Sequence, residues 1–292
     1  FTLVVNLTAQ VLIARHLSKG DFGAFAFALS VVTLGEMVAA FGLKRGVSRF
    51  VPIYEERGEM AKAAGTIVFA FATVVWIGAS VVLVVSGLAG LITGSLDSGS
   101  AEMVLTILIV LAPIQALENL LDGAFAVLAK PRAIVLRKHV YSPLMRFLVV
   151  ALLVAAGKDA EFLAYGWVAT GLFGLAIYGS MLGRALRERG IVLRGVDMPM
   201  REVLRFTVPL LSNDASGAIM NAAGTLILGA LATAADVADL RVVFPIALTM
   251  NYVLNAFGLL FVPLASRLYA RERFDELGTL YWRTAAWTSV LS

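Results

Sequence analysis

The stretch FGAFAFALSVVTLGEMVAAFGLKRGVSRFVPIYEERGE, residues 22–59, joins a long apolar run to a basic, polar segment. Its first part, 22–43, holds a single charged residue, Glu36, and is long enough to cross a bilayer as a helix, which takes about 20 apolar residues. Similar runs recur along the chain. They predict spans at 1–14, 22–43, 65–92, 103–127, 142–156, 162–182, 206–231 and 242–264, with a ninth beginning near 285. The short span 142–156 is expected to start earlier, near Ile134. The predicted fold class is therefore an all-α integral membrane protein, a polytopic helical bundle.

The composition supports a membrane protein and excludes several other classes. Of the 292 residues 60% are hydrophobic and 15% are charged, whereas a soluble domain is about 45–50% apolar and about a quarter charged. The chain has no Cys and only two His, so no thiolate metal site, zinc site or haem is expected. No P-loop motif occurs, so energy would come from a gradient, from consumption of the substrate or from a partner.

The distribution of Lys and Arg predicts the orientation of the spans. Of the 24 basic residues, 20 fall in every second loop, and the positive-inside rule places these even-numbered loops in the cytoplasm. The net charge of +4 then reflects cytoplasmic loops rather than a nucleic-acid surface, and the expected location is the bacterial inner membrane. The even loops are 44–64, 128–146, 183–205 and 265–284. The loop 183–205 reads either as an interfacial helix or as a basic linker.

A repeat predicts two parallel lobes. Phe50-Val51-Pro52 ends the second span, Phe261-Val262-Pro263 ends the eighth, and the segments before these spans align Asp21 with Asp236. Six spans separate the copies, so both have the same orientation, as in transporters built from parallel repeats. We expect two pseudo-symmetric six-helix lobes, with the second truncated in this chain. The predicted boundaries are 1–182 for the first lobe, 183–205 for a cytoplasmic connector and 206–292 for the start of the second lobe.

The segment 14–59 resembles the opening of bacterial polysaccharide and O-antigen exporters, a branch of the multidrug, oligosaccharidyl-lipid and polysaccharide exporter superfamily. The resemblance is carried by Ala14, Arg15, Leu17, Ser18, Asp21, Phe22 and Gly23, then Gly42-Leu43 and Arg49-Phe50. It implies two six-helix lobes around a central cavity, alternating access and the flipping of a lipid-linked saccharide. In such relatives basic residues often line the cavity, whereas in this sequence we expect them at the ends of spans.

Four acids fall inside the predicted spans, where an ionisable side chain costs about 2.5–3.5 kcal/mol at mid-helix. Counting about 1.5 Å per residue puts all four in one layer on the cytoplasmic side. They are candidates for an ion or substrate pathway, and carboxylates in a partly desolvated site suit proton uptake. The alternative for the two in the fourth span is pairing with Lys130 or headgroups. The four acids are Glu36, Glu118, Asp122 and Asp214.

Amide and basic side chains complete the candidate site. The amides form two i,i+4 pairs, which suit sugar hydroxyls or, alternatively, hydrogen bonds between helices. The basic residues at the inner rim suit the pyrophosphate of a lipid carrier or simple anchoring to headgroups. The amides are Asn6, Gln10, Asn251 and Asn255, and the basic residues are Lys44, Arg45, Arg49 and Arg146.

The resulting hypothesis is a flippase that moves an isoprenoid-linked oligosaccharide or polysaccharide precursor across the inner membrane by alternating access. No cofactor is expected, coupling would be to H+ or Na+, and membrane lipids and polysaccharide assembly proteins are candidate partners. The alternative is a cation-coupled multidrug exporter of the same superfamily. A membrane-embedded polysaccharide polymerase or glycosyltransferase is disfavoured because the outer loops are short, so we expect no enzymatic activity.

Overall fold

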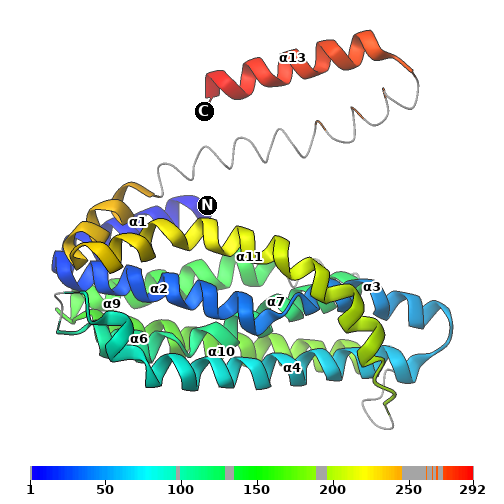
Figure 1. Ribbon diagram of the computed structural model, residues 1–292, viewed down its shortest axis with the longest axis horizontal. Coiled ribbons are helices and arrows are strands. Elements are labelled where there is room, and N and C mark those ends of the chain that lie inside the picture. Colours follow the sequence, from blue (N-terminus) through cyan, green and yellow to red (C-terminus); the bar gives the residue numbers. More distant parts are fainter. Residues whose placement is uncertain are drawn as a thin grey trace. The chain divides into compact units, whose positions relative to one another are not determined.

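The computed structural model describes residues 2–96, 99–128, 135–188, 196–244, 261, 265, 268 and 272–291, and throughout these residues the regular elements are helices (Figure 1). The helices are α1 (Thr2–His16), α2 (Lys19–Ala40), α3 (Leu43–Glu56), α4 (Met60–Gly87), α5 (Ala89–Thr93), α6 (Ala101–Leu108), α7 (Leu111–Val127), the π-helical turn η1 (Leu136–Tyr141), α9 (Ser142–Ala155), α10 (Ala160–Glu188), α11 (Met200–Leu231) and α13 (Phe274–Leu291).

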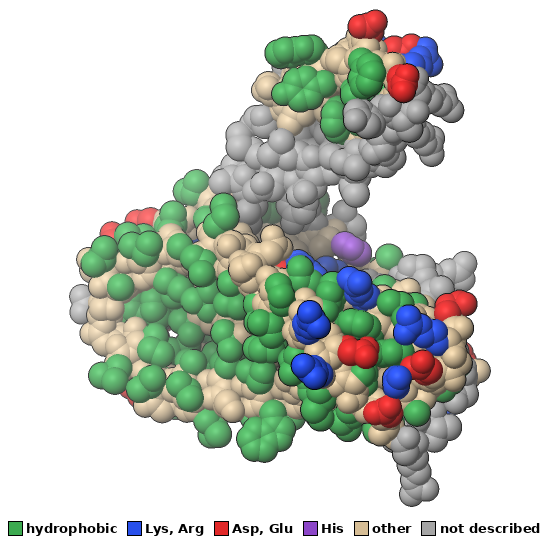
Figure 2. All heavy atoms as spheres, turned by 45° about the vertical axis from the view of Figure 1, so that its right-hand side comes forward, with side chains coloured by type: hydrophobic (Ala, Val, Ile, Leu, Met, Phe, Trp, Pro, Cys, Tyr) green, Lys and Arg blue, Asp and Glu red, His purple; other side chains and the backbone are tan. Residues whose placement is uncertain are grey.

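Six helical segments of the described chain are long and apolar enough to cross a membrane. They are Lys19–Glu56, Met60–Gly87, Ala101–Val127, Leu136–Ala155, Ala160–Glu188 and Met200–Leu231. Large apolar side chains such as Trp76, Leu83 and Phe173 point outward from these helices, as lipid-facing residues do. Figure 2 shows hydrophobic side chains over the flank of the bundle, with many charged side chains gathered at the end that carries α3. The chain is a multi-pass helical membrane protein, as predicted.

Most of the predicted loop 44–64 is helical, because residues 43–56 form helix α3 and helix α4 begins at Met60. A break at Phe41 and Gly42, which have φ of 45° and 63°, separates α3 from α2. A hydropathy window misses α3 because its apolar and polar residues alternate with helical spacing. Val47, Val51 and Tyr54 are buried in the core, whereas the other side of the helix carries basic residues.

The aligned acids Asp21 and Asp236 have the same local role. The Asp21 amide donates to the Ser18 hydroxyl over 3.1 Å, and that hydroxyl donates to the Asp21 carboxylate over 2.7 Å. Likewise the Thr233 amide and hydroxyl donate to the Asp236 carboxylate over 2.9 and 2.6 Å. Both motifs are helix N-caps with an acid three residues on. The hydrogen bonds from the Thr233 side chain and backbone lower the pKa of Asp236.

The described chain divides into two compact units, Phe1–Asp239 and Leu240–Ser292. In the first unit α2 is central, because it packs against α4, α6, α7 and α11. The second unit contains α13, which occupies part of the predicted loop 265–284. The predicted lobe boundaries at 182 and 206 stay a prediction. Most of the second Phe-Val-Pro copy, together with Asn251 and Asn255, lies outside the described residues.

Helix α11 packs against the other helices of the first unit near both of its ends. Close to its start, Val203 and Thr207 are buried against α3, where Gly46 leaves room for them. Close to its end, Gly229 packs on the ring of Phe27, and its carbonyl accepts a hydrogen bond from Ser95 over 2.8 Å. The buried residues of α11 are Val203, Thr207, Ala222, Thr225 and Gly229, so its middle part leaves space beside α2 and α3.

Candidate functional site

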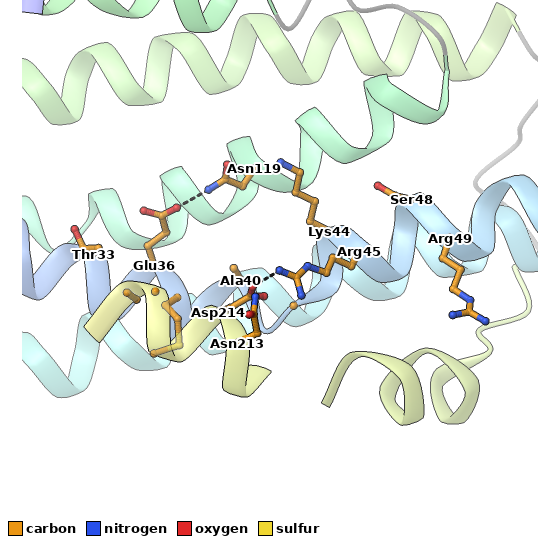
Figure 3. A pocket seen from close by; sticks show the side chains of 14 residues that line it. Thr33, Glu36, Ala40, Lys44, Arg45, Ser48, Arg49, Asn119, Asn213 and Asp214 are labelled. Carbon is orange, nitrogen blue, oxygen red and sulfur yellow. Dashed lines mark hydrogen bonds and ion pairs between the residues drawn. The ribbon is translucent and has the colours of Figure 1, made fainter. Parts of the chain in front are cut away.

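A cavity of about 760 Å³ lies beside the middle of α11, between this helix and α2, α3 and α7 (Figure 3). We call it the larger cavity. Its lining combines acids, bases, amides and small apolar residues, so it has the chemistry of a polar binding site inside an apolar bundle. The lining residues are Thr33, Glu36, Met37, Ala40, Gly42, Lys44, Arg45, Ser48, Arg49, Asn119, Asn213, Asp214, Gly217 and Ala218.

Glu36 projects from α2 and accepts a hydrogen bond from the Asn119 amide of α7 over 2.5 Å. Figure 3 shows the two side chains pointing toward each other. Glu36 lies within a membrane-spanning segment, where a carboxyl needs a polar partner to offset its desolvation. Asn119 is that partner, and together the two residues place a carboxyl and an amide on the cavity wall.

Three basic residues of α3 line the same cavity in different directions. Lys44 lays its side chain against Gly123 of α7, where a Cβ would come within 3.0 Å of the Lys44 Cγ. Arg45 turns toward α11 and donates from Nη2 to the Asp214 carboxylate over 2.6 Å. The guanidinium carbon of Arg49 lies 4.4 Å from the ring centroid of Phe206, a cation–π distance. The sequence prediction of a basic group near the end of the second span thus corresponds to one wall of this cavity.

A second, smaller cavity of about 240 Å³ lies among α1, α2, α7, η1 and α9. Its charged groups are largely paired. Glu118 forms an ion pair with Arg137, and Asp122 accepts a hydrogen bond from the Tyr178 hydroxyl over 2.8 Å. Arg137 also lies 5.2 Å from the Tyr178 ring. The lining residues are Asn6, Glu36, Gln115, Glu118, Asn119, Asp122, Arg137, Lys138, Ser142, Pro143 and Arg146.

Arg146 is not grouped with the three basic residues of α3. It lines the smaller cavity, with its guanidinium carbon 4.7 Å from the ring centroid of Trp167. The helical segment begins at Leu136, so Arg146 lies near the middle of this 20-residue segment. The expectation that basic residues stay at span ends is therefore wrong for Arg146. The aromatic ring and the cavity explain how a cation is tolerated at this depth.

The predicted acid layer is divided between two cavities. Glu36 lines both of them, Asp214 lines the larger one, and Glu118 and Asp122 line the smaller one. Asn6 reaches the smaller cavity, whereas its predicted partner Gln10, one turn later on α1, is outside the lining of both. Because Glu36 and Asn119 are the residues common to both linings, the pair forms the partition between the two cavities.

Two aromatic residues of the site had no role in the sequence prediction, namely Trp167 and Tyr178 of α10. A signal for them was present. Arg137 and Arg146 fall in an apolar segment and need partners there, and aromatic rings are common partners for arginine. Which rings would serve depended on how α10 packs against α9 and α7, and the sequence of α10 alone does not reveal this.

Two comparisons relate the chain to known proteins. A family model described as "Polysaccharide biosynthesis protein" matches residues 2–269. Among solved structures, the chain is similar to an inward-facing multidrug resistance MATE family transporter of the MOP superfamily, with a TM-score of 0.73 and 15% sequence identity. The alignment covers 97% of this chain and 66% of that chain, so this chain spans just under two thirds of its length. No curated protein matches the sequence.

Proposed function

Because the chain belongs to the polysaccharide biosynthesis protein family, we propose that it is part of a flippase for a lipid-linked oligosaccharide or polysaccharide precursor. The observation that carries the proposal is the larger cavity, in which Lys44, Arg45 and Arg49 face a space of about 760 Å³ within a membrane bundle. Arginine and lysine bind phosphate groups well, and arginine does so in a bidentate geometry. The substrate we propose is an isoprenoid diphosphate that carries a saccharide.

The rest of the cavity lining suits the sugar part of such a substrate. Asn119, Asn213, Thr33 and Ser48 offer amide and hydroxyl groups beside the cations, and these groups can donate to and accept from sugar hydroxyls. In this proposal the saccharide enters from the cytoplasmic side and leaves on the other side of the inner membrane, by alternating access. The fold supports this route, because it is shared with a transporter captured in an inward-facing state.

We place the coupling to H+ or Na+ at Glu36. This carboxyl is shared by the two cavities, so its charge acts on both the substrate space and the charged network around Glu118 and Arg137. Glu36→Gln keeps the side-chain size and removes the charge. We expect it to reduce transport without reducing the amount of protein in the membrane. Full transport by Glu36→Gln, measured at equal membrane levels, would remove Glu36 from the coupling mechanism.

A cation-coupled multidrug exporter is the second candidate, and the acids in the larger cavity are what favour it. Of the two lining acids, however, Asp214 already holds Arg45 in an ion pair. The lining has three cations against these two acids, which disfavours a cationic drug and favours an anionic substrate.

The decisive experiment is the leaflet accessibility of lipid-linked saccharide in a deletion strain, probed with a membrane-impermeant reagent that labels sugars. We expect labelled precursor to fall on deletion and to return with the wild-type gene. Arg45→Gln and Arg49→Gln should restore less than wild type. Arg57→Gln is the matched control, because Arg57 caps the end of α3 and is outside the cavity lining. Unchanged labelling on deletion, together with a drug-sensitive phenotype, would favour the multidrug exporter instead.

A further inference from the structure

The ion pair between Arg45 and Asp214 joins two walls of the larger cavity. Arg45 is near the start of α3 and Asp214 is in the middle part of α11, 169 residues later in the chain. Their side chains are 42% and 31% exposed, so a ligand in the cavity can reach both. Figure 3 shows the pair spanning the space between α3 and α11.

The carboxylate of Asp214 has the chemistry of the ligand that Arg45 is proposed to bind. A carboxylate and a phosphate both accept hydrogen bonds from the same edge of a guanidinium, so the two compete for the same donors. A diphosphate has more acceptor oxygens and more negative charge than one carboxylate. It can therefore replace Asp214 at Arg45 while also reaching Lys44 or Arg49.

We propose that Asp214 is an internal competitor for the phosphate site, which holds Arg45 in the empty cavity and yields it when a diphosphate binds. This inference rests on the proposed function, and it assigns Asp214 a role in substrate binding rather than in an ion pathway. Exchange of the partner leaves the Asp214 carboxylate unpaired beside an anion, and the two negative charges repel each other.

In this proposal the repulsion moves the part of α11 that lies between its two buried ends. The buried residues of the helix lie at 203–207 and 222–229, and Asp214 lies between these two groups. Pro209, inside the helix, cannot donate the backbone hydrogen bond that another residue would donate at its position. Loss of the ion pair thus frees the segment beside the cavity while the ends of α11 remain packed on α3 and α2.

The test is a binding measurement on the purified protein in lipid nanodiscs, with farnesyl diphosphate as the probe. A partly exposed ion pair contributes about 0.2–1 kcal/mol, so Asp214→Asn should bind farnesyl diphosphate about 1.4- to fivefold more tightly than wild type. Asp214→Glu should stay near wild type. Asp239→Asn is the charge control, because it removes the same charge from the exposed pair with Lys19.

A double-mutant comparison separates this inference from the proposed function. In the Arg45→Gln background, Asp214→Asn should tighten binding less than it does in wild type, because the competition for Arg45 is gone and only the repulsion between Asp214 and the diphosphate remains. If Asp214→Asn weakens binding or leaves it unchanged while Arg45→Gln weakens it, the internal competitor is refuted and the phosphate site stands. If farnesyl diphosphate does not bind wild type at all, both the internal competitor and the proposed function are refuted.

Further arms of the same measurement identify the source of the phosphate. Inorganic pyrophosphate and farnesol are tested separately against wild type and Asp214→Asn. If Asp214→Asn binds farnesyl diphosphate more tightly than wild type does but binds farnesol equally well, Asp214 competes with the diphosphate group. Equal tightening with farnesol would refute it, since an alcohol has no charge to compete with Asp214. Pyrophosphate binding as tight as that of farnesyl diphosphate would assign the site to a free anion and contradict the lipid-linked substrate.

Discussion

Gly23 makes a contact in the first unit that tolerates no side chain. It lies near the start of α2, against the carbonyl of Ala234, and a Cβ added to it would lie 1.7 Å from the carbonyl oxygen and 2.6 Å from the carbonyl carbon. Real Cβ atoms do not approach other atoms within 3.0 Å, so the two backbones must separate by at least 1.3 Å. The nearby pair of Lys19 with Asp239, at 2.9 Å, joins the same two segments.

The expected cost of Gly23→Ala follows from two opposing terms. Replacing Gly by Ala inside a helix stabilises it by about 1 kcal/mol, whereas overpacking of this kind costs about 1–3 kcal/mol. Because the clash is with backbone, which cannot rotate away, we expect a net destabilisation of up to about 2 kcal/mol. Gly20→Ala is the matched control on the same helix. Its nearest atom would be the Ser18 hydroxyl at 3.9 Å, so it should be neutral or stabilising.

Thermal unfolding of the detergent-solubilised protein measures the difference, with Gly23→Ala melting several degrees below Gly20→Ala. The chain has no Cys, so a Lys19→Cys, Asp239→Cys pair with a short thiol crosslinker reports the contact directly. Crosslinking should be slower when Gly23→Ala is added. If Gly23→Ala melts at the temperature of Gly20→Ala and crosslinks at the wild-type rate, the reasoning about this contact is refuted.

Three other predictions concern stability. Gly65→Ala should lower the melting temperature, because its Cβ would lie 1.8 Å from the Asp197 carbonyl oxygen, whereas Gly183→Ala, with no atom within 4 Å, should not. Tyr54→Phe should cost about 1–2 kcal/mol in unfolding free energy through loss of its 2.5 Å bond to Glu202, with the exposed Tyr165→Phe as the neutral control. Asp236→Ala should be less stable than wild type above about pH 4, and the gap should shrink as the pH falls through the lowered pKa of Asp236, a trend that melting curves across pH can check.

The spans could be predicted because the signal for each is local. A run of apolar residues must cross about 30 Å of hydrocarbon with its backbone satisfied, so length and hydropathy within one segment suffice. Helix α3 is a different case. Its apolar residues pack against α4 and α7, whereas Lys44 and Arg45 line the larger cavity. Hydropathy averaged over a window mixes the two kinds of residue and does not indicate this helix.

The partners of the charged residues could not be predicted from the sequence. Glu36 and Asn119 are 83 residues apart, and Arg45 and Asp214 are 169 apart. Depth along each helix placed the acids in one layer, but depth does not give the rotation of a helix about its axis. The rotation of each helix about its axis, and the helix that packs beside it, decide the partner of each acid. Glu118 therefore pairs with Arg137 in the smaller cavity, whereas Asp214 pairs with Arg45 in the larger one.

By itself, the sequence determined that this protein is a multi-pass helical membrane protein, and it indicated most of the helical segments that are long and apolar enough to cross a membrane. The physical reason is that hydrophobic burial in a bilayer acts segment by segment. The tertiary structure alone decided that the charged side chains line two cavities divided by Glu36 and Asn119, and that Arg146 lies in the smaller one beside Trp167. Such pairs depend on packing between distant helices, which no local pattern records.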